Sequence, residues 1–288
     1  MIVTMENKKI SIIGYGFVGK ATDYGFSKNV EKLLIDPLLG TSIEEIEAFK
    51  PDLIFICLPT PMNDDGTQDS SLIIKTLSEL DHYNLTCPIV IKSTVLPDIL
   101  EKSKEISRKL VYNPEFLREK HAEDDFINSP MVILGGENKE VEIVEKIYKN
   151  NSVCKTSNYI RTDIKSASLI KYTINSFLAT KVLFFNEIKR IFDEISCESS
   201  WDTFTDIISN DSRIGSSHMM VPGHDGKKGF GGACFTKDTA ALINYARSIK
   251  ASFDLLESAV KINNKIRSSY KDLDQREKEQ NVNYNFEN

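Results

Sequence analysis

One cysteine lies in a glycine-rich loop followed by charged residues, an arrangement that suits covalent chemistry. The loop, DGKKGFGGACFTKD, carries Cys234, and Lys237 and Asp238 follow within four residues. Glycines let the backbone approach a ligand closely, and a thiol beside a cation is stabilised as the reactive thiolate. A cysteine can equally be a small buried apolar residue. The loop alone therefore supports a nucleophile and a structural cysteine about equally.

A second glycine-rich stretch has the pattern of a dinucleotide-binding turn. The strand KISII at 9–13 leads into GYGFVG at 14–19 and a helix, and the strand LLID at 33–36 ends on an aspartate. In this pattern the glycines allow a tight turn, close approach of the pyrophosphate and helix–strand packing. The terminal carboxylate binds the ribose hydroxyls and repels a 2′-phosphate, so NAD is favoured over NADP. The expected cofactor-binding residues are Gly14, Tyr15, Gly16, Phe17, Val18, Gly19 and Asp36.

Four more apolar runs predict buried strands, and the first three lead into polar residues. They lie at 52–58, 88–95, 109–116 and 131–136, with helical stretches between them. This alternation predicts an α/β fold, an N-terminal Rossmann domain with a doubly wound parallel sheet. Ligands of such sheets bind at the carboxyl ends of the strands. The residues expected at that edge are Leu58, Thr60, Ser93, Thr94 and Glu115.

Residues 163–195 contain no glycine or proline and carry apolar residues at helical spacing. They predict one helix, roughly 50 Å long, in an all-α central dimerisation domain. Its apolar stripe is wide, which indicates burial against other helices or a second subunit. Lys171 and Asn175 are four residues apart and share a polar face. A solvated face is the alternative explanation for such a pair.

Composition excludes several classes of function. The 288 residues carry a formal net charge of −6, which does not suit nucleic-acid binding. No apolar run approaches the length of a membrane span, so a cytoplasmic protein without membrane partners is expected. The five cysteines show no zinc or disulfide spacing. His218 and His224 have no third ligand at a useful distance, so no metal site is predicted.

Five segments, in order, resemble the nucleotide-sugar 6-dehydrogenases of the UDP-glucose/GDP-mannose dehydrogenase family. They are GYGFVG at 14–19, KSTV at 92–95, NPEFLRE at 113–119, KYTINSFLATKVLFFNEI at 171–188 and GFGGACFTKD at 229–238. The resemblance implies NAD-dependent oxidation of a sugar C6 hydroxyl to a carboxylate, with UDP-glucose as the leading substrate. Two hydride transfers would pass through a thiohemiacetal and a thioester on Cys234. Because the family has a further C-terminal domain for the nucleotide sugar, a shortened form is expected.

The resemblance also implies roles for single residues. Lys171 would stabilise the alkoxide-like oxygen and Asn175 would donate a hydrogen bond to it, while Asp238 and Thr94 order a water or the lysine. Glu115 would be the base for thioester hydrolysis, or would only orient its loop. Glu119 and Lys237 would lie near the cofactor. The substrate contacts implied are Glu115, Phe116, Leu117, Arg118, Lys171, Asn175, Arg213, Gly229, Phe230 and Gly231.

Three domain segments are expected: an NAD-binding domain at 1–158, a helical domain with the cysteine loop at 159–270, and a disordered polar tail at 271–288. The partners expected are the nucleotide sugar and a second copy of the chain, bound through the long helix. Two other functions stay open. One is a β-hydroxyacid-type dehydrogenase, which needs no nucleophilic cysteine, and the other is an inactive NAD-binding module.

Overall fold

The computed structural model describes residues 7–285, which form two compact units. Unit 1 is the chain up to Thr60 together with Ser70–Lys171. Unit 2 is Pro61–Asp69 together with the chain from Tyr172 onward.

Unit 1 is built on a seven-stranded sheet in the order β2-β1-β3-β4-β5-β6-β7. All neighbouring strands are parallel except β5 and β6, so the predicted doubly wound sheet is confirmed with one antiparallel pair. The strands are β1 (Lys8–Ile13), β2 (Val30–Ile35), β3 (Leu53–Ile56), β4 (Ile89–Ile91), β5 (Leu110–Tyr112), β6 (Val132–Gly136) and β7 (Tyr159–Thr162).

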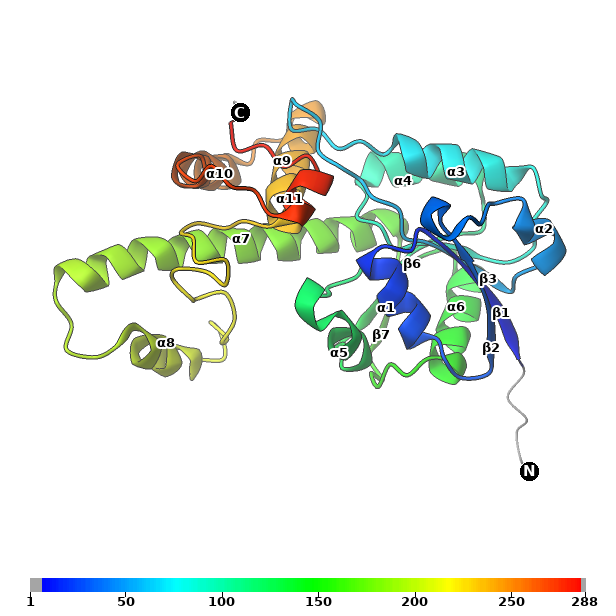
Figure 1. Ribbon diagram of the computed structural model, residues 1–288, viewed down its shortest axis with the longest axis horizontal. Helices are drawn as coiled ribbons and strands as arrows, with labels where there is room; N and C mark the ends of the chain where they lie inside the picture. Colours follow the sequence, from blue (N-terminus) through cyan, green and yellow to red (C-terminus); the bar gives the residue numbers. More distant parts are fainter. Residues whose placement is uncertain (1–6, 286–288) are drawn as a thin grey trace. The chain divides into compact units, whose positions relative to one another are not determined.

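Helices cover both faces of this sheet because successive strand residues point to opposite sides. Ile54 and Ile56 pack with α2, α3 and α4, whereas Leu53 and Phe55 pack on the face covered by α5 and α6 (Figure 1). The helices of unit 1 are α1 (Phe17–Gly25), α2 (Glu45–Phe49), α3 (Ser71–Asp81), α4 (Pro97–Ile106), α5 (Ala122–Ile127) and α6 (Asn138–Asn151), with short 3₁₀ turns η1 (Pro37–Leu39) and η2 (Glu119–His121).

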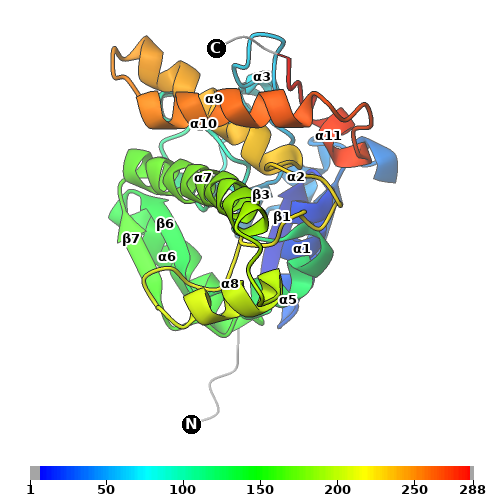
Figure 2. The ribbon, with the colours of Figure 1, turned by 90° about the vertical axis from the view of Figure 1, so that its left-hand side faces the viewer.

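The long helix α7 (Ile164–Glu194) begins in unit 1 and continues into unit 2. It agrees with the predicted helix to within one residue at each end. Unit 2 adds α8 (Trp201–Ser209), α9 (Ala233–Ser248), α10 (Asp254–Arg267) and α11 (Gln275–Glu279). Figure 2 shows α9 and α10 side by side, with α11 beyond them. Among the described helices, none is both long and apolar enough to cross a membrane.

The sheet extends beyond the expected domain boundary at 158. β7 pairs with β6 through four residue pairs, Val132 with Tyr159 to Gly135 with Thr162, and unit 1 continues to Lys171. The sequence YIRT lacks an apolar run because β7 is an edge strand without a fully buried residue. Hydrophobic periodicity therefore could not identify it.

The C-terminal tail is ordered over residues 271–285, so the prediction of disorder is wrong there; residues 286–288 lie outside the described residues. A capping box joins Asp274 and Glu277 at the start of α11, and Glu277, Val282 and Tyr284 are buried. The polar composition predicted a solvated tail. In the structure, the Glu277 carboxylate and the Tyr284 hydroxyl are buried and hydrogen-bonded to each other.

A segment between β3 and α3 belongs to unit 2. In residues 61–69, Met62 pairs with Gln68 in an isolated antiparallel bridge, and its N–H donates to the carbonyl of Gln280 at 3.0 Å. Met62 is buried. Unit 2 is therefore assembled from two separate stretches of sequence.

Replacing Gly25 by alanine tests the packing of α1 on α5. A Cβ at Gly25 would lie 2.1 Å from a ring carbon of Phe126, a buried ring that stacks in an aromatic cluster. We expect Gly25→Ala to lower the free energy of unfolding by about 1–3 kcal/mol, measured by urea denaturation. Gly16→Ala is the control because nothing lies within 4 Å of its Cβ position. Equal stability of Gly25→Ala and the wild type would contradict this packing.

Candidate active site

The turn between β1 and α1 has the geometry that a dinucleotide requires. Gly14 has φ +89°, and a Cβ there would lie 2.7 Å from the Cys57 carbonyl oxygen; a Cβ on Gly19 would lie 2.0 Å from the Gly14 oxygen. Gly16, the N-cap of α1, is exposed and has open space beside it. The first turn of α1, which starts with Phe17 and Val18, contains no acidic side chain. Its N–H groups are therefore suited to a pyrophosphate, and these residues fit NAD.

Asp36 follows β2, where the ribose-binding carboxylate was expected. Its Oδ2 accepts a hydrogen bond from the Tyr15 N–H at 2.7 Å, and its Oδ1 accepts one from the Leu38 N–H at 2.9 Å. These bonds fix the carboxylate beside the glycine turn. The side chain is half-buried, so part of it remains accessible to a ligand.

The ends of β3 and β4 are joined through their hydroxyl groups. Ser93 Oγ donates to the Leu58 carbonyl at 2.7 Å, and Thr60 Oγ1 donates to the Thr94 carbonyl at 3.0 Å. Four of the five residues predicted at this edge, all except Glu115, therefore lie together at the carboxyl ends of two neighbouring strands. The Ser93 and Thr60 hydroxyl groups have a structural use here, and the contact of these residues with a cofactor stays a prediction.

Lys171 and Glu115 form a buried ion pair in unit 1. The Lys171 Nζ donates to the Glu115 carbonyl at 2.6 Å and lies 3.7 Å from its Oε1. The ammonium also lies 5.0 Å from the centroid of the Phe116 ring, and Glu115 Oε2 accepts the Leu117 N–H at 2.6 Å. The lysine charge is thus compensated by a carboxylate, as a buried charge requires.

In unit 2, the fully buried carboxylate of Asp238 binds two other predicted site residues. Its Oδ2 accepts from Asn175 Nδ2 at 2.7 Å and its Oδ1 from Lys237 Nζ at 2.5 Å. Cys234 is the second residue of α9, one turn before Asp238, and is half-buried. A thiol at a helix N-terminus is stabilised as thiolate by the helix dipole. Asn175 lies one turn along α7 from Lys171.

Two of the other cysteines are held as thiols. Burial raises the pKa of Cys57 to about 12 and that of Cys87 to about 11. Both side chains lie in the core of unit 1. No disulfide joins any of the five cysteines, all of which are within residues 7–285. Cys234 differs from these two core cysteines in its partial exposure and its place at a helix start.

The glycines around Phe230 are required by packing on α10. The Phe230 N–H donates to Asn263 Oδ1 at 2.7 Å, and Asn263 Nδ2 donates back to the Phe230 carbonyl at 2.9 Å. A Cβ on Gly229 would lie 2.5 Å from Asn263, and a Cβ on Gly231 would lie 1.9 Å from Arg267. The predicted sugar contacts of these three residues stay a prediction, since α10 alone accounts for the glycines.

Three charged residues predicted at the site are exposed. Arg118 forms a bidentate pair with Asp125 at 3.0 and 2.7 Å, and Arg213 pairs with Asp211. Glu119, the first residue of η2, is also exposed. Arg118 is therefore paired with a residue of α5 and Arg213 with a residue two positions before it, and their substrate contacts stay predictions.

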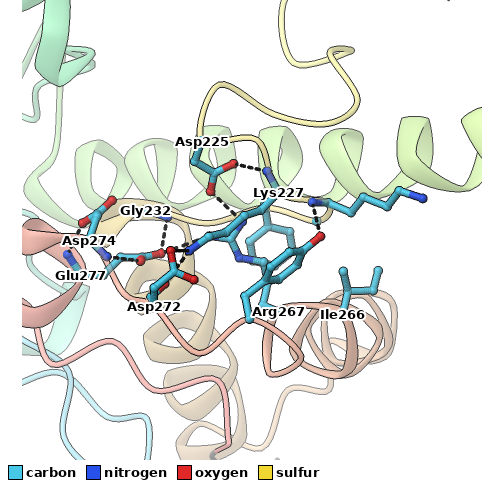
Figure 3. A network of polar contacts seen from close by, with 12 residues as sticks. Asp225, Lys227, Gly232, Ile266, Arg267, Asp272, Asp274 and Glu277 are labelled. Carbon is cyan, nitrogen blue, oxygen red and sulfur yellow. Dashed lines mark hydrogen bonds and ion pairs between the residues drawn. The ribbon is translucent and has the colours of Figure 1, made fainter.

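The sequence analysis did not identify the residues that hold the cysteine loop in place. Figure 3 shows this network, in which Arg267 bonds Asp225 and Glu277 while Glu277 accepts the Gly232 N–H. The spacing Asp274–x–x–Glu277 was a visible signal, since an acidic N-cap with glutamate three residues later marks a helix start. No sequence signal identifies its contact with Gly232.

Comparison with known proteins identifies the family of this chain. The NAD binding domain of the UDP-glucose/GDP-mannose dehydrogenase family matches residues 25–152, and the central domain of that family matches residues 165–265. The UDP-glucose 6-dehydrogenase of Rickettsia felis is 35% identical over 231 residues, which are 77% of this chain and 50% of that protein. The chain therefore belongs to the UDP-glucose/GDP-mannose dehydrogenase family and carries its NAD-binding domain.

Solved structures show the same fold. A UDP-glucose dehydrogenase from Pyrobaculum islandicum superposes with TM-score 0.75 and 22% identity, over 91% of this chain and 69% of that one. The 3-hydroxyisobutyrate dehydrogenase of Mycobacterium tuberculosis superposes with TM-score 0.69 and 16% identity, over 93% of this chain and 96% of that one. Both likenesses concern the fold alone. The chain spans about half the length of the curated relatives that it matches.

Asp36→Asn tests the cofactor preference that the turn predicts. The amide has nearly the same shape and keeps one oxygen for the Tyr15 N–H, but it no longer repels a 2′-phosphate. We expect the dissociation constant of NADP divided by that of NAD to fall by roughly tenfold or more in this variant. Tenfold corresponds to about 1.4 kcal/mol of binding free energy. Isothermal titration with both cofactors measures it. Comparable affinity of the wild type for NAD and NADP would contradict the role of Asp36.

Proposed function

We propose that the chain oxidises the C6 hydroxyl of a nucleotide-diphosphate sugar, UDP-glucose first among them, to a carboxylate. The observation that carries the proposal is Cys234 in the first turn of α9, one turn before an Asp238 that binds Asn175 and Lys237. A single alcohol oxidation needs no nucleophile. A second oxidation does, because the aldehyde must be held and converted into a species from which hydride can leave.

The side chains of this protein act before and after the two hydride transfers. NAD, when bound, is the hydride acceptor. Lys171 stabilises the oxygen of the C6 hydroxyl as its proton leaves, and Asn175 donates a hydrogen bond to the same oxygen. The Cys234 thiolate adds to the aldehyde carbon to give a thiohemiacetal, which becomes a thioester when its hydride leaves. Water activated by Glu115 then releases the acid and the thiolate. Thr94 and Asp238 fix the water and the neighbouring lysines.

A second candidate is a single oxidation of a small hydroxyacid. The glycine turn, Lys171 and Asn175 would serve this reaction as well. Such a reaction would leave Cys234 without a chemical role. The yield of NADH separates the candidates: two per substrate consumed for the nucleotide sugar and one for the hydroxyacid.

We also propose that the chain forms a homodimer through α7. Phe177, Phe184 and Ile191 recur every seven residues on this helix and are 64%, 57% and 54% exposed. Apolar side chains at this spacing form one stripe along a helix, and such stripes are normally covered. A second copy of the same helix presents the same stripe, so a symmetric interface covers both at once.

Cys234→Ser tests the covalent steps. With a panel of UDP- and GDP-sugars, we expect the wild type to produce NADH, followed at 340 nm, and carboxylate in a ratio of two to one. The serine variant should form no carboxylate above background but bind NAD as the wild type does, because the cofactor turn lies in unit 1. Cys197→Ser, another half-buried cysteine, is the matched control and should keep full activity. Carboxylate formation by Cys234→Ser at the wild-type rate would refute the nucleophile.

Phe184→Glu tests the dimer. Burying one phenylalanine side chain stabilises an interface by roughly 1.5–3 kcal/mol, so a charge there should weaken dimerisation at least about tenfold. Sedimentation velocity at micromolar concentration measures the change. Leu38→Glu is the control, since Leu38 lies in η1 and is 96% exposed. A wild-type chain that sediments as a monomer under these conditions would exclude the interface.

A further inference from the structure

We propose that the C-terminal segment Asp274–Tyr284 is a positioning element for Cys234, with Glu277 and Tyr284 as its positioning residues. The inference rests on the proposed function in that it assigns the segment a part in the chemistry of this thiol. The segment lies beyond the central domain match, which ends at residue 265.

The segment bonds the chain on both sides of Cys234. On the N-terminal side, Glu277 Oε1 accepts the Gly232 N–H at 3.0 Å (Figure 3). On the C-terminal side, the Tyr284 hydroxyl accepts from Thr236 Oγ1 at 3.3 Å. The same hydroxyl donates to Glu277 Oε1 at 2.7 Å, so the two contacts form one connected bridge. Cys234 lies at the centre of the five residues that this bridge spans.

The bridge holds the backbone turn at the start of α9. Gly232 is the N-cap of α9 and has φ +79°. As a glycine it has no side chain with which to cap the helix. Because glycine adopts many conformations, such a turn needs external contacts to stay in one of them. Glu277 supplies one at the N-cap, and Tyr284 supplies another within the first turn. Both act where the helix dipole stabilises a thiolate, an effect that fades beyond that turn.

The charges of the bridge are balanced inside unit 2. Arg267 lies between Asp225 at 2.7 Å and Glu277 at 3.3 Å, and its guanidinium is almost fully buried. Burial raises the pKa of Glu277, but the Tyr284 hydroxyl, the N–H groups of Asp274 and Gly232 and the Arg267 charge outweigh it, so the pKa lies below its ordinary value. Burial also raises the pKa of Tyr284, which keeps its hydroxyl protonated as the donor.

Tyr284→Phe tests the proposal because it removes one oxygen and changes no charge. Tyr270→Phe is the matched control: Tyr270 also lies beside Arg267, but its hydroxyl accepts the Lys228 N–H, in the outer part of the loop. Iodoacetamide alkylation of each cysteine in the full chain is followed by peptide mass spectrometry from pH 5 to 10. Cys197 serves as an internal reference, and circular dichroism checks the fold. The assay needs neither NAD nor sugar.

We expect Tyr284→Phe to shift the pH midpoint of Cys234 alkylation upward by about half a unit. This shift corresponds to roughly threefold slower alkylation at neutral pH. Cys197 should not change, and Tyr270→Phe should match the wild type. A Cys234 profile that superimposes on the wild type would overturn the proposal. If Tyr284→Phe does not fold, Glu277→Gln replaces it, and unchanged hydrogen exchange of residues 230–236 would overturn the proposal instead. Absence of nucleotide-sugar oxidation would refute the proposed function without altering these results.

Discussion

The buried carboxylate of Asp238 is the interaction on which the helical unit depends. A fully enclosed charge is tolerated only when its partners are close and well placed, and removing one of them leaves a large desolvation cost. Here the partners are Asn175 on α7 and Lys237 on α9 itself. The Asn175–Asp238 bond therefore joins the two helices, whereas Lys237 compensates the charge from within α9. Cys234 lies in the first turn of α9, one turn before Asp238, on the backbone that this bond holds.

Much of unit 1 could be predicted because its signals are local. Runs such as DLIFICL have the length and apolar character of buried strands, and the glycines at 14 and 19 stand where a Cβ would collide with backbone. The carboxyl ends of parallel strands meet at one edge, so Ser93 and Thr60 could be placed together without knowing their partners. The long helix was visible for the same reason, since its period persists over eight turns or more.

The parts that escaped prediction depend on distant partners. β7 is a strand because β6 offers an edge to it, and its own four residues have little apolar character. The tail looked disordered because its polar groups outnumber its apolar ones. Glu277 becomes a core residue only through Arg267, Tyr284 and Gly232. Likewise, Gly229 and Gly231 suggested a ligand in the sequence, whereas the side chains of α10 explain them in the structure.

The segment at 61–69 makes unit 2 discontinuous, and this has a consequence for the order in which the chain folds. The N–H of Met62 bonds the carbonyl of Gln280, so a segment that follows β3 and a segment that follows α11 share one contact. During synthesis this contact cannot form until Gln280 has left the ribosome, whereas the strands of unit 1 are all made earlier. Contacts between such distant residues also slow folding, because a long loop must be closed first. A fragment cut at α7 would therefore divide a folding unit rather than separate two.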